Sequence, residues 1–350
     1  MPEASNINPG RKIIFVLLVV VSLVFLVWSR LVLVFIFLLI VFDFVTTGYL
    51  YSILRPRLPS IVLKLISLLF YIATPVLFAV LIRTLFFDYY YVPTASMERT
   101  ISKGEYVLTN KVAYGSRIPR SWKEIPVFGN LFKSHVDTIN FQPFTSLNPF
   151  KDYQREDIVV FKAIDQIDKY YVKRIVGLPT DTLLIANGQV SINGSLLPDK
   201  EQYCKNYLVT NTLGKRSIRN LSNSEYRVFV NEEANKNLSI GPDTITKGSR
   251  LLGGSQHPNW DANNYGPLIV PGEGLTVLIN KENYPLYKYI LENFEDWQTP
   301  VPSGNETNLH TFKQDYVFVL GDNRDGSIDS RNFGVVPFNF LQGKVVKIIR

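Results

Sequence analysis

The sequence predicts a mainly β protein that carries transmembrane helices at its N-terminus. The first ninety or so residues hold nearly unbroken apolar runs, whereas the remainder of the chain reads as an ordinary globular sequence. Beyond residue 88, short β-branched and aromatic runs are bounded by Gly, Pro, Asn or Asp, which is typical of strands and turns. In that region Tyr284–Trp297 is the one stretch that indicates an amphipathic helix.

Three apolar segments form the predicted membrane anchor, which covers residues 1–87. These segments are residues 13–28, 31–54 and 61–82. A membrane-spanning helix needs about 20 residues, so the second and third segments are long enough and the first is short. A shallow hairpin of the first two segments is the alternative to two full spans. A cleaved signal peptide at the first segment is a further alternative, but no A-x-A-like cleavage site follows it and another apolar run begins at once. We therefore expect an uncleaved, multi-pass anchor.

Basic residues beside the apolar segments predict the orientation of the anchor. They are Arg11 and Lys12 before the first segment, and Arg55 and Arg57 between the second and the third, with Lys64 near the start of the third. Basic flanks stay on the cytoplasmic side of a membrane. With both clusters in the cytoplasm, everything after residue 88 lies outside it.

The charge balance and the metal-binding residue types exclude two other classes of function. The chain has 37 Lys and Arg against 30 Asp and Glu, a net charge of +7, but no zinc-finger spacing and no long basic block. The excess sits largely beside the apolar segments, so we predict no nucleic-acid partner. Cys204 is the only cysteine, and His135, His257 and His310 lack ligand spacing. We accordingly predict no metal and no cofactor.

Residues 88–350 are expected to form an extracytoplasmic domain of small antiparallel sheets. The expected strands are Glu105–Lys111, Asp157–Lys162, Tyr170–Leu178, Thr182–Ile192, Leu275–Asn280, Tyr316–Leu320 and Gly343–Ile349. Residues 88–112, 155–181 and 316–350 are the predicted catalytic core, and residues 182–315 are a second, inserted β-rich subdomain. Ser116–Tyr153 and Cys204–Gly274 are rich in Pro, Asn and Ser and are predicted as long excursions from the sheets.

Two clusters of residues suggest nucleophilic chemistry. Ser96 lies in the stretch 91–97, directly after the third apolar segment, and Lys173 and Arg174 interrupt an apolar strand pattern. Side chains alternate along a strand, so one of these two cations should point toward the packed side. Burial lowers the pKa of a lysine, which suits it to act as a general base. The alternative for this strand alone is that Lys173 is an edge charge facing water.

A third cluster, residues 321–334, packs charges and hydroxyl groups between two strand patterns. A plain turn needs far fewer polar groups, so this loop is predicted to be a hydrogen-bonded scaffold. A solvated or calcium-binding loop is the alternative, although the Asp spacing does not fit an EF-hand. Together the three clusters suggest a Ser–Lys catalytic apparatus, which needs no histidine.

With these clusters in their order, the chain resembles the bacterial type I signal peptidases, or leader peptidases, which are Ser–Lys serine proteases. The matching boxes are residues 93–97, 155–161, 171–181 and 321–337. The resemblance implies a signal-peptidase-like β fold behind a membrane anchor. It also implies removal of N-terminal signal peptides from exported preproteins by cleavage after small residues of the Ala-x-Ala type.

The resemblance implies a role for each matching residue. Ser96 would be the nucleophile and Lys173 the general base, while the Thr94 hydroxyl and the Ser96 N–H would form the oxyanion hole. Ser327 would hydrogen-bond to Lys173 and orient it. The residues implied to brace the site are Asp329, Arg331, Asp322 and Arg174, and those implied to line the substrate pockets are Val92, Pro93, Tyr171 and Val172.

The implied partners are preproteins with signal peptides and the lipid bilayer, with the secretion translocon as a further candidate. The implied location is the bacterial inner (cytoplasmic) membrane, with the catalytic domain on the periplasmic side. A non-enzymatic membrane receptor and a self-cleaving repressor are the competing hypotheses. The Ser96 and Lys173 pair argues against the first, and the membrane segments argue against the second.

The sequence departs from the pattern of these peptidases at five positions. They are Arg99 for a proline, Glu105 for an aspartate, Glu156 and Thr180 for glycines, and Gly326 for an asparagine. None of these changes removes the nucleophile, the base or an oxyanion donor. We expect them to affect loop geometry and substrate preference.

Overall fold

The computed structural model describes residues 54–116, 153–164, 169–232, 237–243, 252, 260–304 and 306–350. The first predicted membrane segment, nearly all of the second, and most of the excursion Ser116–Tyr153 lie outside these residues. The described residues belong to two compact units. The first contains residues 54–88 and Ser116, and the second contains residues 89–115 and the described residues from 153 onward.

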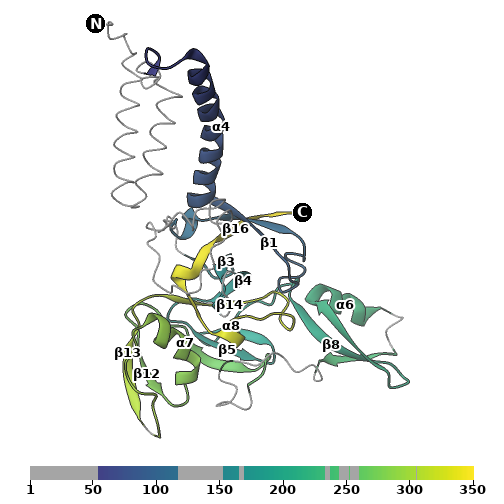
Figure 1. Ribbon diagram of the computed structural model, residues 1–350. Coiled ribbons are helices and arrows are strands. Elements are labelled where there is room, and N and C mark those ends of the chain that lie inside the picture. The colour runs from purple at the N-terminus through teal and green to yellow at the C-terminus, as the bar shows by residue number, and fades with distance from the viewer. Residues whose placement is uncertain are drawn as a thin grey trace. The chain divides into compact units, whose positions relative to one another are not determined.

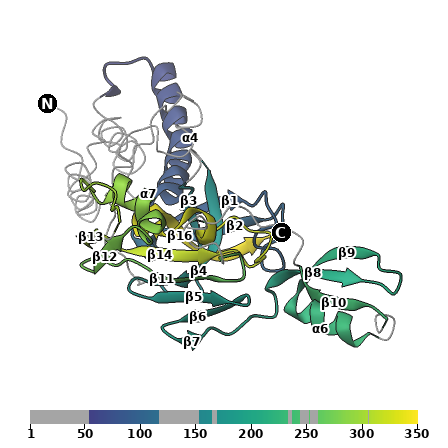
Figure 2. The same cartoon turned by 90° about the horizontal axis from the view of Figure 1, so that it is seen from below.

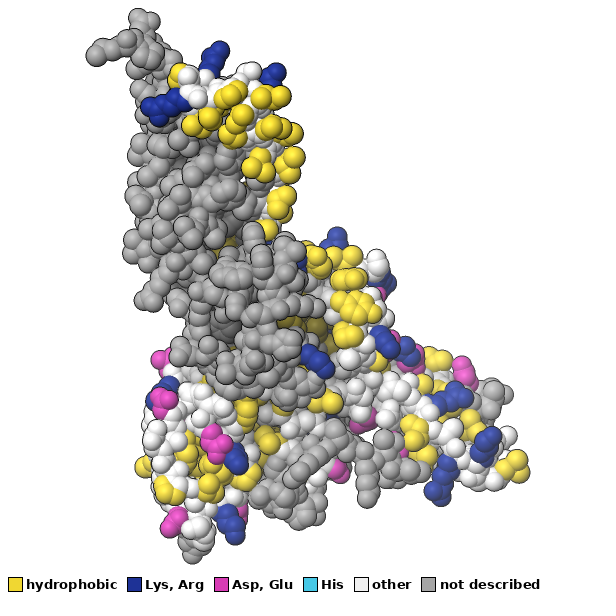
Figure 3. Space-filling view, viewed as in Figure 1, with side chains coloured by type: hydrophobic (Ala, Val, Ile, Leu, Met, Phe, Trp, Pro, Cys, Tyr) yellow, Lys and Arg dark blue, Asp and Glu magenta, His cyan; other side chains and the backbone are white. Residues whose placement is uncertain are grey.

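Helix α4 (Ser60–Leu85) dominates the first unit and includes the third predicted membrane segment. It has 26 residues and contains Pro75. Large apolar side chains along it are exposed, among them Ile61, Leu65, Leu68, Leu69, Ile72, Val76 and Phe78. Figure 3 shows such side chains along the visible face of this helix. Among the helices in the described part of the chain, none has both the length and the apolar character needed to cross a membrane.

A seven-stranded sheet forms the centre of the second unit (Figure 1). Its strand order is β1-β2-β16-β3-β4-β14-β15. The strands are β1 (Phe87–Tyr91), β2 (Tyr106–Asn110), β3 (Ile158–Lys162), β4 (Tyr170–Gly177), β14 (Tyr316–Leu320), β15 (Val336–Pro337) and β16 (Leu341–Ile349). Strand β4 is central and pairs antiparallel with β3 on one side and β14 on the other. The prediction of a mainly β, antiparallel fold is confirmed for the described residues.

Three smaller sheets come from the part of the chain between β4 and β14. One contains β5 (Thr182–Ala186), β6 (Gln189–Ile192), β7 (Ser195–Leu196) and β11 (Tyr265–Ile269), and another pairs β12 (Thr276–Asn280) with β13 (Thr307–Thr311). The third contains β8 (Cys204–Thr210), β9 (Arg216–Ser222) and β10 (Ser239–Pro242). Figure 2 shows this third sheet together with helix α6 (Asn223–Asn231).

The structure differs from the sequence prediction at several elements, since strands β1, β8–β11 and β13 and helix α6 were not predicted. The expected single strand Thr182–Ile192 is a hairpin, because Asn187 and Gly188 both adopt positive φ, 51° and 72°, and turn the chain. Helix α6 was not expected in the excursion Cys204–Gly274. Its signal was present in the sequence, since Ser222 and Glu225 form a capping box at its start. The predicted helix at Tyr284 is confirmed as α7 (Tyr284–Phe294).

The region predicted as an inserted subdomain shares one hydrophobic core with the central sheet. Val176 of β4 and Phe318 of β14 pack in the same buried cluster as Leu183, Tyr265 and Leu291. The short helix α8 (Ser330–Phe333) follows the polar loop after β14. Ile175 of β4 and Val319 of β14 belong to a second buried cluster, so apolar packing holds these two strands on both faces of the sheet.

Candidate active site

The turn that carries Ser96 follows β1 and is pinned at both ends. The Val92 N–H donates to the Glu105 carbonyl at 2.9 Å, and the Gly104 N–H donates to the Val92 carbonyl at 2.8 Å. Met97 and Ile101 are fully buried beneath the turn. Ser96 is 7% exposed. The turn thus holds a buried serine hydroxyl on a fixed backbone.

Lys173 meets Ser96 from the middle of β4. Its Nζ lies 2.6 Å from the Ser96 Oγ and 3.0 Å from the Val172 carbonyl, and the residue is 3% exposed. This burial excludes the edge-charge interpretation of the strand. The expectation that only one of Lys173 and Arg174 would face the packed side is wrong, because Arg174 is also buried, at 4% exposed, and is paired with Asp322.

Burial lowers the pKa of Lys173 to about 8, because the ammonium loses its hydration in this setting. The negative charges of Asp329 and Asp322 act in the opposite direction and raise it. Arginine partners offset these carboxylates, as described next. The result is a lysine whose neutral form is accessible near neutral pH, within hydrogen-bonding distance of a serine hydroxyl.

Two buried arginine–carboxylate pairs flank Lys173. The Arg174 Nε and Nη2 donate to the two oxygens of Asp322 at 2.8 and 2.6 Å, and the Arg174 Nη1 donates to the Glu156 carbonyl at 2.8 Å. The Arg331 Nε and Nη2 donate to the two oxygens of Asp329, both at 2.9 Å. Such bidentate pairs fix geometry as well as charge.

Asp329 also organises the polar loop after β14. It caps helix α8 and accepts the Gly321 N–H at 3.1 Å. Burial by itself would raise the pKa of Asp329, but the Arg331 charge and these hydrogen bonds outweigh it and hold that pKa below its usual range. The carboxylate is therefore ionised at neutral pH and stabilises both the loop and Arg331.

Replacing Asp329 with asparagine is expected to destabilise the fold by about 3–5 kcal/mol, because the buried Arg331 loses its counter-charge. Asparagine is itself a good helix cap, so the loss reports on the ion pair and not on the cap. Denaturant unfolding of the full chain measures the effect. The control is Asp296→Asn, which breaks an ion pair with Lys313 whose Asp296 side chain is 83% exposed. An equal loss of stability in both variants would contradict the assignment.

The predicted hydrogen bond from Ser327 to Lys173 is not formed in this structure. Among the described residues the buried Ser327 Oγ has no hydrogen-bond partner, and the Lys173 amine is occupied by Ser96 and Val172. Ser327 lies against Gly321 instead, where a Cβ on the glycine would come within 2.2 Å of the Ser327 Oγ. Ser327 therefore contacts the site by packing against the backbone of the polar loop at Gly321, and not through a hydrogen bond to Lys173.

The sequence analysis missed the residues that tie the polar loop to the serine turn. The Asn323 N–H donates to the Ser96 carbonyl and its side-chain amide donates to the Ala95 carbonyl, both at 3.1 Å. The Thr100 hydroxyl donates to Asp322 at 2.5 Å. These contacts join segments far apart in sequence, and nothing in the local pattern of either segment predicts them.

Cys204 has a structural position beside the same loop. Its N–H donates to the Asp322 carbonyl at 2.9 Å, and its carbonyl accepts the Arg324 N–H at 2.8 Å. Burial raises the pKa of the thiol to about 11, so it is a protonated, buried side chain and a poor nucleophile. The start of β8 thereby pairs with the polar loop.

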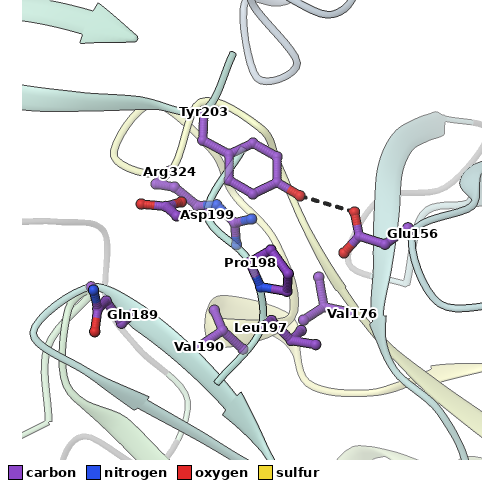
Figure 4. A pocket seen from close by; sticks show the side chains of 10 residues that line it. Glu156, Val176, Gln189, Val190, Leu197, Pro198, Asp199, Tyr203 and Arg324 are labelled. Atoms are coloured by element: carbon purple, nitrogen blue, oxygen red, sulfur yellow. Dashed lines mark hydrogen bonds between the residues drawn. The ribbon is translucent and has the colours of Figure 1, made fainter. Parts of the chain in front are cut away.

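A small pocket is lined in part by Arg324 of this loop (Figure 4). Tyr203 donates its hydroxyl to Glu156 at 3.1 Å, and the Arg324 guanidinium lies 4.2 Å from the centroid of the Tyr203 ring. The cavity of about 20 Å³ is room for about one water molecule, and neither Ser96 nor Lys173 lines it. We therefore do not assign the substrate to this pocket.

The family model described as "Signal peptidase, peptidase S26" matches residues 65–349. The chain belongs to the S26 signal peptidase family. It is accordingly a serine endopeptidase, and the competing hypotheses of a non-enzymatic receptor and a self-cleaving repressor are set aside.

Individual relatives show the same likeness. The chain is 32% identical over 287 residues to a signal peptidase I of Buchnera aphidicola subsp. Baizongia pistaciae, covering 78% of this chain and 73% of the relative. It is 26% identical over 290 residues to a signal peptidase I of Pseudomonas aeruginosa, covering 78% and 69%. A solved signal peptidase I from Enterococcus faecalis V583 aligns with a TM-score of 0.25 and 21% identity, over 56% of this chain and 98% of that one.

Three of the departures from the family pattern are explained by backbone geometry. Glu156 and Thr180, which stand where the pattern has glycine, adopt positive φ of 76° and 70°. The left-handed turns that favour glycine are therefore kept by other residues. Gly326 lies beside Asn323, and a Cβ at that position would come within 2.4 Å of the Asn323 Nδ2. A larger residue at position 326 would require Asn323 to move.

Two of the four predicted pocket residues share a buried apolar cluster next to the serine turn. Val92 and Val172 pack with Met97 and Ile101 beneath it. Tyr171 is half-buried, and the Lys173 Nζ lies 5.5 Å from the centroid of its ring. Pro93 is exposed. The structure thus brings Val92, Tyr171 and Val172 near the Ser96 and Lys173 pair.

Proposed function

We propose that this chain removes N-terminal signal peptides from exported preproteins, cleaving after small residues of the Ala-x-Ala type with a Ser96–Lys173 dyad. The observation that carries the proposal is the distance of 2.6 Å between the Ser96 Oγ and a buried Lys173 Nζ. Neutral Lys173 takes the proton of Ser96 as the hydroxyl attacks the scissile carbonyl. The resulting ammonium then gives that proton to the leaving amine, and water hydrolyses the acyl-enzyme.

The Ser96 N–H and the Thr94 hydroxyl are the proposed oxyanion donors. Within the described residues, the hydrogen bonds of Ser96 involve its hydroxyl and its carbonyl, and its N–H donates to no protein group. The Thr94 Oγ1 lies 3.3 Å from the Ser96 Oγ, on the same turn. Two fixed donors beside the attacking oxygen can stabilise the charge that develops on the carbonyl oxygen.

Strand β4 supports a β-strand mode of substrate binding. The ladder between β14 and β4 runs from Phe318↔Gly177 to Leu320↔Arg174, so it ends next to Lys173. Strand β4 continues beyond that point to Tyr170. An extended peptide that adds to this stretch would place its scissile carbonyl near Ser96 and its small side chains near Val92 and Val172.

A membrane anchor in residues 1–87 completes the proposal. Its support is the three apolar segments with their basic flanks and the exposed apolar side chains along α4. The anchor would hold the site at the extracytoplasmic face of the bacterial inner membrane, close to membrane-inserted preproteins and the secretion translocon. Such tethering raises the effective concentration of enzyme and substrate.

Cleavage of a preprotein with an Ala-x-Ala site by the detergent-solubilised full chain tests this function. We expect a single cut after the second alanine, identified by mass spectrometry of both products. A matched preprotein with Leu in place of that alanine should remain intact, because the side chain exceeds a small pocket. The assay is run at pH values below and above the Lys173 pKa of about 8. Failure of the folded enzyme to cut the first substrate at any of them would refute the proposal.

The rate of cleavage is expected to rise with pH and to level off above the pKa of Lys173, which is about 8. Burial lowers this pKa from the usual lysine value. Below it the protonated lysine predominates, and the fraction of neutral base falls about tenfold for each unit by which the pH drops. A pH profile of kcat/KM measures this dependence. Thermal unfolding at each pH serves as the control for loss of folded enzyme, and a flat profile across pH 8 would contradict a lysine base.

A further inference from the structure

Arg99 makes an ion pair that crosses from the serine turn to the region between β4 and β14. The Arg99 Nη2 lies 2.8 Å from the Glu225 Oε1, and its Nε donates to the Glu225 Oε2 at 3.1 Å. Arg99 stands three residues after Ser96 and has a φ of 69°, a conformation that disfavours residues other than glycine. A strained backbone held by a bidentate side chain indicates a position fixed by its partner.

Glu225 is itself fixed at the start of helix α6. Its Oε2 accepts the Ser222 N–H at 2.8 Å, and its N–H donates to the Ser222 Oγ at 3.2 Å. Ser222 pairs in the β8–β9 ladder with Cys204. Cys204 in turn hydrogen-bonds to the polar loop on both sides of Asn323.

These contacts form a continuous series of hydrogen bonds, strand pairing and an ion pair that begins and ends at the serine turn. From Ser96 the path runs through its carbonyl to Asn323, and from the loop to Cys204 and β9. It continues through the capping box to Glu225, and returns through Arg99 to the serine turn. The Arg99 Nη1 also lies 3.9 Å from the Glu98 Oε1 within the turn, but among the described residues the pair with Glu225 is the side-chain ion pair that links the turn to α6. Without it, the far end of the turn would lose its tie to α6.

We propose that Arg99 is a positioning residue, which with Glu225 ties the turn after Ser96 to helix α6 and holds the serine hydroxyl in reach of Lys173. The inference rests on the proposed Ser96–Lys173 mechanism. It gives helix α6, and the sheet that carries it, a part in catalysis without contact with the substrate. Small displacements of a nucleophile lower the rate of the chemical step more than they lower substrate binding.

The variants Arg99→Gln and Glu225→Gln test whether the Arg99–Glu225 ion pair, called the tether below, positions Ser96. Glutamine at position 225 keeps the capping box, so helix α6 stays capped. We expect each variant to lower kcat about 3- to 10-fold with KM changed less than about 2-fold, and the double variant to be no worse than either single one. Arg99→Lys, which retains the charge but not the bidentate geometry, should recover part of the rate.

Arg227→Gln is the matched control, because it breaks another exposed ion pair of α6, with Glu201 at 3.0 Å, that does not touch the serine turn. It should leave kcat unchanged. Arg99→Gly separates the two features of Arg99, since glycine tolerates the positive φ but lacks the charge. It should lose as much kcat as Arg99→Gln. Unchanged kcat in Arg99→Gln, or additive losses in the double variant, would overturn the proposal.

Hydrogen exchange of the peptide that covers residues 94–104 is a second readout, and it does not require activity. Faster exchange is expected in Arg99→Gln and Glu225→Gln but not in Arg227→Gln. If the wild-type enzyme showed no cleavage activity, the proposed function would be refuted. The hydrogen-exchange measurement would still decide whether the Arg99–Glu225 pair holds the serine turn. Equal exchange in all three variants would show that it does not.

Discussion

Replacing Ser96 with alanine is expected to abolish cleavage of an Ala-x-Ala preprotein while the fold is retained. The alanine removes the Oγ that lies 2.6 Å from the Lys173 Nζ and leaves the rest of the turn in place. Loss of a serine nucleophile lowers kcat on the order of 10⁴-fold or more in serine proteases. Because Met97 and Ile101 hold the turn by burial, the thermal midpoint should change little.

The measurement is a time course of preprotein cleavage by full-length enzyme in detergent, with intact mass as the readout. Ser102→Ala is the matched control, since Ser102 lies in the same segment and contacts Glu105 through its backbone N–H and carbonyl, which alanine retains. This control should retain activity. Turnover by Ser96→Ala within tenfold of the wild-type rate would refute Ser96 as the nucleophile.

Lys173→Met and Lys173→Arg are expected to lose about 10³-fold or more in kcat, for two different reasons. Methionine removes the amine but fills a similar volume in the buried site, whereas arginine keeps a cation that does not deprotonate. Burying an ammonium is unfavourable, so methionine should leave the folded state as stable as before or make it more stable. The structure thus predicts loss of activity without loss of stability in Lys173→Met.

Denaturant unfolding and preprotein cleavage measured on the same samples separate these effects. Lys205→Met provides the control for a lysine-to-methionine change, because Lys205 pairs with Asp199 away from Ser96. Appreciable cleavage by Lys173→Arg at any pH would show that the base is another group. Unfolding of Lys173→Met at a much lower denaturant concentration would show that the lysine is needed for folding.

The sequence predicted the parts of this protein that depend on local pattern. Strands β3, β4 and β14 lie within about one residue of their expected bounds, because β-branched runs between turn residues specify strands locally. Alternation along β4 indicates that Lys173 or Arg174 faces the packed side but does not decide which, and the apolar setting of Lys173 is implied only by the resemblance. The burial of both side chains is not predicted, because that of Arg174 depends on Asp322, which lies 148 positions further along the chain.

The contacts that complete the site could not be predicted for the same reason. Asn323 reaches Ser96, and Cys204 reaches Asp322, only after sheets distant in sequence have packed together. The hydrogen bond assigned by resemblance to Ser327 is replaced by steric contact with Gly321. Helix α6 is an exception among the unpredicted elements, because its capping box of Ser222 and Glu225 can be recognised in the sequence.

The junction between the serine turn and the polar loop has a consequence for the biogenesis of the enzyme. Ala95 and Asn323, which it joins, stand 228 positions apart, so the ribosome makes one long before the other. Strand β14 and both buried carboxylates that flank Lys173 also come well after Ser96 in the chain. Ser96 is therefore synthesised before the residues that surround Lys173. We expect the proposed Ser96–Lys173 dyad to become competent only after β14 and the polar loop have folded against the serine turn.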